Sequence, residues 1–302
     1  MVQKAFKLQM IKHNTTVIKG IVDSNLSGGI TQEMLQGGGV IDPFNAVTVG
    51  SKPRLSYTTT DIKTYLDACG IDGLAITGSA IFYAYYRQMA DGGTFTGGAN
   101  DTLATINKGI MHINSINAPL NKIATLSSNV IPTYDATNLP VAITINATAP
   151  TITRDTEAFI GGPMSINSTF YPTQGWTFDL GANYQVLGSD GLIYDTEAFL
   201  VSRAPKFTIP NFNMQLLSAI GPLAGIAAAT VKFWLRKTTI GGGGAVADAT
   251  AEHILLTATV ASAYVESVAA TSTSLATQNL VIVPVWNISN AIVTVSTTSA
   301  IA

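Results

Sequence analysis

Alternating apolar and polar residues recur along the chain and predict a protein built mainly of β-strands. Apolar side chains occupy every second position in several short runs, which is the period of a strand with one buried face. These runs centre on Phe6/Leu8/Met10, Val141/Ile143/Ile145, Val231/Phe233/Leu235 and Val293/Val295. We expect their polar residues to face outward. Turn-rich segments separate the runs, notably residues 25–39, 92–100, 161–163 and 241–244.

Two short segments instead carry apolar residues at helical spacing. The first stripe is Ile62, Tyr65, Leu66 and Cys69, between candidate N-cap residues 58–61 and Gly70, which can end a helix. The second stripe is Phe212, Leu216, Leu217 and Ile220, between Asn211 or Asn213 as a cap and Gly221-Pro222 as a stop. One helix near residues 61–69 and one near 212–220 are therefore predicted, each with an apolar face for a sheet.

The two halves of the chain resemble each other at a fixed offset. A shift of 152 positions aligns residues 39–77 with 191–229 without a gap. Identical pairs in this window are Gly39/Gly191, Ile41/Ile193, Ala46/Ala198, Val49/Val201, Pro53/Pro205, Gly73/Gly225 and Ala75/Ala227. The same offset returns at Ala124/Ala276, Thr125/Thr277, Pro132/Pro284, Asn138/Asn290 and Val141/Val293, with Tyr134 opposite Trp286. The alternative explanation is a composition shared by β-sandwiches in general.

The repeat and the length of 302 residues together predict two tandem, similar domains of the β-sandwich or barrel type, each with one short helix packed on a sheet. The first repeat would span residues 1–150 and the second 151–302. The boundary is expected within residues 149–154, because Pro150 interrupts strand pairing after Ile145.

A low content of charge favours assembly over nucleic-acid recognition. Only 11% of residues are charged, against roughly 25% in an average globular protein, so much of the polar surface must be Thr, Ser, Asn and Gly. Interface cores also exclude charge, which makes a homo-oligomer the expected state. The net charge of −2 provides no basic surface for binding phosphates, so DNA is expected only as a non-specific passenger and sequence-specific binding is not expected.

The chain carries no motif typical of secretion or membrane insertion. The N-terminal residues MVQKAFKLQMIKHN lack the continuous apolar core of a signal peptide, so no export by that route is expected. The longest apolar run, residues 219–231, is shorter than the roughly 20 residues needed to span a bilayer. Cys69 is the single cysteine, which excludes an intrachain disulfide.

No constellation of residues predicts an enzyme, so we expect no catalytic, cofactor-binding or metal residues and no cofactor. His13, His112 and His253 are far apart in the sequence and none belongs to an HExxH motif. The glycine run at 241–244 lacks the Lys-Ser/Thr of a phosphate-binding loop, and no GxSxG motif is present. Cys69 lies on the buried stripe of a predicted helix, where a thiol behaves as a small hydrophobic group.

One short motif has no assigned role. Asp155–Phe159 (DTEAF) recurs as Asp195–Phe199, forty residues later. Two pairs of carboxylates could bind Ca²⁺ through oxygen ligands, or they could be coincidental or cap strand ends, since no Asp/Asn/Gly loop surrounds either pair.

With these features, the chain resembles virion structural proteins of tailed bacteriophages, in particular tail tube proteins. The segments that carry the resemblance are residues 52–62 (KPRLSYTTTDI), 70–74 (GIDGL) and 188–191 (GSDG). The resemblance implies a β-sandwich flanked by a helix, and hexameric rings that stack into a tube lined by a closed β-barrel. It also implies that three copies of a two-domain chain form a pseudo-hexameric ring in a virion, alongside other virion proteins, after synthesis in the host cytoplasm. The segment 258–277, rich in Ala, Ser and Thr, departs from the family and leaves its strands in doubt.

Other functions are compatible with the same composition. A double jelly-roll capsid protein also uses two tandem β-domains and pseudo-hexameric trimers. A secreted carbohydrate-binding or adhesin module would require a signal peptide and an exposed aromatic platform. We further expect the loops at 25–39, 92–100 and 241–248 to make contacts between subunits. Ordering their many glycines costs backbone entropy, which contacts with another subunit could offset.

Overall fold

The computed structural model describes residues 5–35, 45–90, 95–96, 98–152, 157–210, 226–239, 244–271, 274–286 and 291–301. Its secondary structure is mainly β, as predicted, with one helix in these ranges. The first 150 residues form β1 (Ala5–His13), β2 (Thr16–Ile18), β3 (Ile21–Ser27), β4 (Ile30–Leu35), β5 (Asn45–Ser51), β6 (Arg54–Thr59), α1 (Ile62–Cys69), β7 (Leu74–Ile76), β8 (Phe82–Met89), β9 (Asp101–Ile106), β10 (Gly109–Pro119), β11 (Thr125–Pro132) and β12 (Ala142–Ala147). The remainder forms β13 (Glu157–Ile166), β14 (Thr169–Tyr171), β15 (Gly175–Asp179), β16 (Asn183–Gly188), β17 (Asp195–Ser202), β18 (Lys206–Ile209), β19 (Ile226–Thr239), β20 (His253–Thr271), β21 (Ser274–Pro284) and β22 (Thr294–Ser299).

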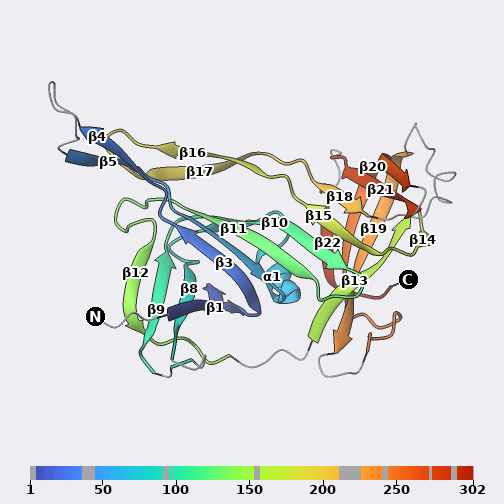
Figure 1. Ribbon diagram of the computed structural model, residues 1–302, viewed down its shortest axis with the longest axis horizontal. Coiled ribbons are helices and arrows are strands. Elements are labelled where there is room, and N and C mark those ends of the chain that lie inside the picture. Colours follow the sequence, from blue (N-terminus) through green and yellow to red (C-terminus); the bar gives the residue numbers. More distant parts are fainter. Residues whose placement is uncertain are drawn as a thin grey trace.

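The strands form one large sheet, one smaller sheet and two separate two-stranded hairpins (Figure 1). The large sheet has the order β14-β13-β19-β20-β21-β18-β15-β10-β11-β6-β3, with β22 beside β20 and β7 beside β10. The smaller sheet has the order β12-β9-β8-β1-β2, and β4 pairs with β5 as β16 pairs with β17. Because β10 of the N-terminal half pairs with β15 of the C-terminal half, the large sheet runs without interruption through both halves.

Helix α1 confirms the prediction for residues 61–69. Ile62, Tyr65, Leu66 and Cys69 are all buried, as the apolar stripe requires. Gly70 ends the helix with φ +63°, a left-handed conformation that glycine adopts at little cost. The N-cap residue is Asp61, but its carboxylate accepts a hydrogen bond from the Lys19 backbone N–H and caps no helix N–H. The helix start is thereby tied to the connection between β2 and β3.

Two other predictions concern the C-terminal half. The predicted helix near 212–220 lies outside the described residues. The segment 258–277, whose strands were in doubt, belongs to the long antiparallel strands β20 and β21 over the part that the structure describes.

Three predictions about strands and turns were wrong. Residues 25–27 belong to β3 and residues 30–35 to β4, so this part of the predicted turn-rich segment is extended. Residues 161–163 lie inside β13, at an irregularity in its pairing with β19. Ile143 and Ile145 are exposed instead of buried, because β12 is the edge strand of the smaller sheet and packs few neighbours.

The buried hydrophobic side chains form one cluster with members from both halves. In the C-terminal half the rings of Phe207 and Phe233 stack with centroids 4.2 Å apart, and Trp176 lies 5.3 Å from Phe233. In the N-terminal half Tyr57 packs 6.5 Å from Phe82 and donates its hydroxyl to the sulfur of Met111. The core therefore draws aromatic side chains from both halves of the chain. In the described part of the chain, no helix has the length and apolarity to cross a bilayer.

Candidate assembly surfaces

The two halves meet in an antiparallel strand pair, which we call the joint (β10 with β15). Its register pairs Ser115 with Asp179, Ile116 with Phe178, Asn117 with Thr177, Ala118 with Trp176 and Pro119 with Gly175. The backbones at the end of the joint are very close. A Cβ added to Gly161 would overlap the Ala118 carbonyl oxygen, and one added to Gly175 would lie 2.9 Å from the same atom. The close approach at Gly161 explains why the glycines of residues 161–163 lie in strand β13 and not in a turn: a side chain there would collide with the neighbouring backbone.

The hairpin β16–β17 continues from the joint and lies against the N-terminal half. Its backbone accepts a hydrogen bond at Ile193 from Ser51 N–H (2.7 Å) and at Asp195 from Tyr134 N–H (2.8 Å). Figure 1 shows this hairpin extending toward β4 and β5 at one end of the molecule. The backbone contacts place the C-terminal half's hairpin over strands of the N-terminal half.

Charged side chains reinforce this docking. The Asp195 carboxylate is only 6% exposed and lies 3.6 Å from Lys52 Nζ and 3.7 Å from Arg54 Nη2. Glu197 accepts a hydrogen bond from Lys108 Nζ at 2.5 Å. A buried carboxylate needs compensating cations. The hairpin is therefore stabilised where both Lys52 and Arg54 reach Asp195.

Aromatic rings pack beside these ion pairs. Tyr134 and Tyr194 have ring centroids 5.7 Å apart. His112 stacks on Tyr184 at 4.2 Å, and burial lowers the pKa of His112 below its ordinary value, so the ring is mostly neutral at pH 7. The docking therefore combines apolar ring contacts with a buried charge.

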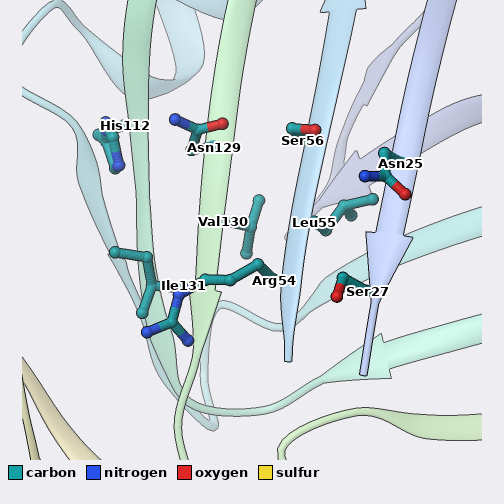
Figure 2. A pocket seen from close by; sticks show the side chains of 9 residues that line it. All are labelled: Asn25, Ser27, Arg54, Leu55, Ser56, His112, Asn129, Val130 and Ile131. Carbon is teal, nitrogen blue, oxygen red and sulfur yellow. The ribbon is translucent and has the colours of Figure 1, made fainter. Parts of the chain in front are cut away.

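The face of the large sheet opposite the core is polar across the joint. Directly opposed residues on adjacent strands share a face. One row, from β3 to β10, consists of Asn25, Ser56, Asn129 and His112 (Figure 2). A second row crosses the joint from β3 to β18 through Asp23, Thr58, Ser127, Ser115, Asp179 and Lys206. Residues that alternate with them, such as Tyr57, Ile116 and Phe178, are buried in the core.

A hollow of about 330 Å³ lies over the first polar row, bounded by Arg54, Leu55, Val130 and Ile131 (Figure 2). Its titratable side chains are His112 and Arg54, and its other polar groups are amides and hydroxyls. A neutral histidine without an adjacent nucleophile or carboxylate provides no acid–base pair. We therefore assign no reaction to this hollow.

The histidines singled out in the sequence lie on three different strands and do not come together. His13 is on β1, His112 on β10 and His253 on β20. His253 is fully buried, and its Nδ1 accepts a hydrogen bond from Lys237 N–H. Within the ranges given above, no three His, Cys, Asp or Glu side chains form a group that could hold a metal ion. Cys69 is buried as predicted, and burial raises the pKa of its thiol to about 12.

The recurring DTEAF motif places its carboxylates in separate ion pairs. Asp155 and Thr156 lie outside the described residues. Glu157, on β13, pairs with Lys237 at 2.6 Å, whereas Asp195 and Glu197 belong to the docked hairpin. In the sequence, the only indication of this part of the interface was the recurrence of the DTEAF motif. The motif did not indicate which basic residues its carboxylates would contact.

Two of the strand edges of the large sheet that have no partner among the described residues lie on β3 and β20. The outer edge of β3 is one, because β3 ends the strand order. The other is the C-terminal part of β20, where residues 265–271 pair with β21 on one side, while pairing with β19 ends at Ala263. An unpaired edge offers backbone N–H and C=O groups to another strand.

Exposed apolar side chains gather on the hairpin β4–β5. Ile30 is 64% exposed and Met34 63%, and Leu35, Val47 and Val49 are also exposed. A two-stranded hairpin with apolar residues on its surface is not stable alone, so this surface fits a protein partner. The loop at 92–100, in contrast, is in part held by its own chain, because Phe95 lies under the Arg87 guanidinium and Thr96 bonds to the Gln88 carbonyl.

No protein-family model matches the chain, and a search of curated proteins found no match.

Proposed function

We propose that this protein is a non-enzymatic structural subunit of a virus particle, made of two copies of one domain, and that it assembles into rings that stack as a tube like that of a phage tail. The observation that carries the proposal is the joint. One half already pairs edge to edge with the other, and among the described residues β3 and the C-terminal part of β20 each leave an edge of the same kind without a partner. Repetition of this contact between chains extends the sheet.

Recurring strand pairs support the duplication. Strand pairs β3·β6, β6·β11 and β10·β11 have counterparts in β15·β18, β18·β21 and β20·β21. Their registers agree at the offset of 152: Leu26 pairs with Leu55 as Phe178 pairs with Phe207, and Leu55 pairs with Val130 as Phe207 pairs with Ile282. That residues 1–150 and 151–302 are two similar domains with one topology stays a prediction.

The polar face of the sheet supports a tube that conducts DNA. Its two rows carry mostly Ser, Thr and Asn, with Asp179 directly opposite Lys206. Such a face presents neither the basic stripe that would hold phosphates nor a continuous acidic one. We propose that this face lines the lumen and lets DNA pass without binding.

A heterologous contact of this kind closes into a ring if its rotation divides a full turn, and otherwise forms a filament. Three copies of a two-domain chain would give pseudo-sixfold symmetry. Closure would also pair the free edges of β3 and β20 with each other, which protects these edges from irregular aggregation.

Negative-stain electron microscopy of the purified protein tests the proposal. We expect rings of uniform diameter, or tubes built from them, over a range of salt and protein concentrations. Closed shells would favour the double jelly-roll capsid protein instead. A monomer that never assembles under any of these conditions would contradict the proposal and favour a binding module.

A further inference from the structure

The register of the contact between chains can be derived from the joint inside one chain. The joint consists of an edge of β10 and the edge of β15. At the offset of 152, residues 115–119 of β10 correspond to 267–271 of β20, and residues 175–179 of β15 correspond to 23–27 of β3. Among the described residues, the segment of β3 has no partner on its outer side, and residues 267–271 of β20 pair with β21 on one side only.

The backbone of each open edge has the geometry of its counterpart in the joint. Strand β10 has a register shift against β11 between Ile113 and Ser115, and β20 has the same shift against β21 between Val265 and Ser267. Beyond the shift, Ser115 pairs with Ser127 as Ser267 pairs with Asn279. The bulge that directs β10 toward β15 is therefore repeated in β20.

The partner edge shows the same agreement. On β15, Thr177 and Asp179 pair with Thr208 and Lys206, and on β3 Asn25 and Ser27 pair with Ser56 and Arg54. Each of these pairs lies at the offset of 152 from its counterpart. One chain thus carries, on β3 and β20, the equivalents of the two strand edges that are already paired with each other in its joint.

We propose that β3 of one copy pairs antiparallel with the C-terminal part of β20 of a second copy, with Leu26 opposite Val268 and Asn25 opposite Ala269. This register follows from Ile116 opposite Phe178 and Asn117 opposite Thr177 in the joint. The inference rests on the proposed self-assembly and specifies its partner surface.

The exposed aromatic side chain of Trp286 supports the same partner. Tyr134 of the N-terminal half packs against Tyr194 of the second hairpin, and the position 152 residues after Tyr134 is Trp286, which is 63% exposed. In the proposed contact the apolar hairpin β4–β5 of the neighbouring copy lies over Trp286, as β16–β17 lies over Tyr134. Two otherwise unexplained apolar surfaces would then cover each other.

Cysteine cross-linking tests the register. The in-register variants are Leu26→Cys with Val268→Cys and Asn25→Cys with Ala269→Cys. The matched controls exchange partners, Leu26→Cys with Ala269→Cys and Asn25→Cys with Val268→Cys, because a slip of one residue turns the two thiols to opposite faces. Directly opposed residues in an antiparallel pair have Cα atoms within the range that a disulfide spans. The parent, with buried Cys69 alone, controls for the native thiol.

Oxidation with diamide and non-reducing electrophoresis provide the readout. We expect a ladder of covalent oligomers from at least one in-register variant, at more than tenfold the yield of the exchanged pairs, and none from the parent. Particles in the microscope without in-register cross-links, or with equal cross-linking of the exchanged pairs, would overturn the register and leave the proposed function standing. Monomers in the microscope together with no cross-links would overturn both.

Discussion

The rings of Tyr134 and Tyr194, from the two halves of the chain, lie with centroids 5.7 Å apart where the tip of hairpin β16–β17 docks on the N-terminal half. The position equivalent to Tyr134 in the second half is Trp286, whose ring is largely exposed. At equivalent positions, Tyr134 of the N-terminal half therefore makes an aromatic contact within the chain, whereas the indole of Trp286 in the C-terminal half is exposed.

Substitution of these two residues is expected to have opposite consequences. Tyr134→Ala removes an aromatic pair inside the chain and should lower the free energy of unfolding by about 1 kcal/mol or more. Trp286→Ala removes an exposed ring and should leave stability within about 0.5 kcal/mol of the parent while reducing assembly. Urea unfolding of dilute protein and sedimentation of concentrated protein measure the two effects. A Trp286→Ala variant that assembles like the parent would count against the role of this residue.

The ion pairs of Asp195 predict that removing its two cations lowers the stability of the protein more than removing its carboxylate does. Replacing Lys52 and Arg54 together by Met leaves a buried carboxylate uncompensated and should cost about 3 kcal/mol. Asp195→Asn leaves two cations that water can reach, since Lys52 is 58% exposed and Arg54 36%, and should cost about 1 kcal/mol or less. Urea unfolding at pH 7 measures both, and the reverse order would show that Asp195 does not depend on these cations.

Close packing at the joint predicts that Gly161 tolerates no side chain. Gly161→Ala forces a Cβ against the carbonyl of Ala118 and should destabilise the protein by about 2 kcal/mol. Gly78→Ala is the matched control, because nothing lies within 4 Å of its Cβ position, and its effect should stay within about 0.5 kcal/mol. Equal melting temperatures for the two variants would contradict the close approach of the strands.

The buried thiol of Cys69 predicts a loss of stability in alkali. Its pKa is about 12 in the folded protein, above the ordinary value of 9.0, because burial disfavours the thiolate. The unfolded chain therefore loses its proton first. This contribution to stability is complete below pH 9 and falls by about 1.4 kcal/mol per pH unit between pH 9 and about 12.

Comparison with Cys69→Ala isolates this effect from the tyrosines. Burial also raises the pKa values of Tyr57 and Tyr65, which adds a loss of the same sign above pH 10 in both proteins. Between pH 9 and 10 the stability of the variant should fall less steeply than that of the parent. Parallel pH profiles would mean that the thiol ionises equally easily in both states.

Helix α1 predicts a local test of packing. Leu66→Ala should lower the free energy of unfolding by about 2 to 5 kcal/mol, because Leu66 is buried. Lys63→Ala, on the outer side of the same helix, removes only an exposed ion pair with Asp67 and should cost a few tenths of a kcal/mol. Thermal unfolding of both variants checks the difference, and a neutral Leu66→Ala would contradict the packing. The equivalent test at Leu217 concerns a residue outside the described ranges.

Local signals in the sequence were sufficient for elements whose conformation depends on their own residues. The stripe from Ile62 to Cys69 and the terminal Gly70 specify α1, because helix spacing and a left-handed C-terminal residue are properties of eight or nine neighbouring positions. The alternation of Val231, Phe233 and Leu235 likewise predicted buried strand positions in β19, although Trp234, on the opposite face, is buried as well. The offset of 152 also appeared in the sequence, since equivalent positions meet similar packing demands.

The tertiary structure alone decided which strand edges meet. Asn25 and Gly161 belong to sequences typical of turns, and both lie in strands because backbones from distant segments pair with or press against them. Ile143 has the spacing of a core residue but lies on an edge strand. The partner of β10 is β15, more than fifty residues away, and the burial of Asp195 beside Lys52 and Arg54 follows from that pairing. The backbone hydrogen bonds that pair strands are nearly the same for every residue. The sequence therefore indicated several of the strands, whereas the partners at the joint were decided by the fold.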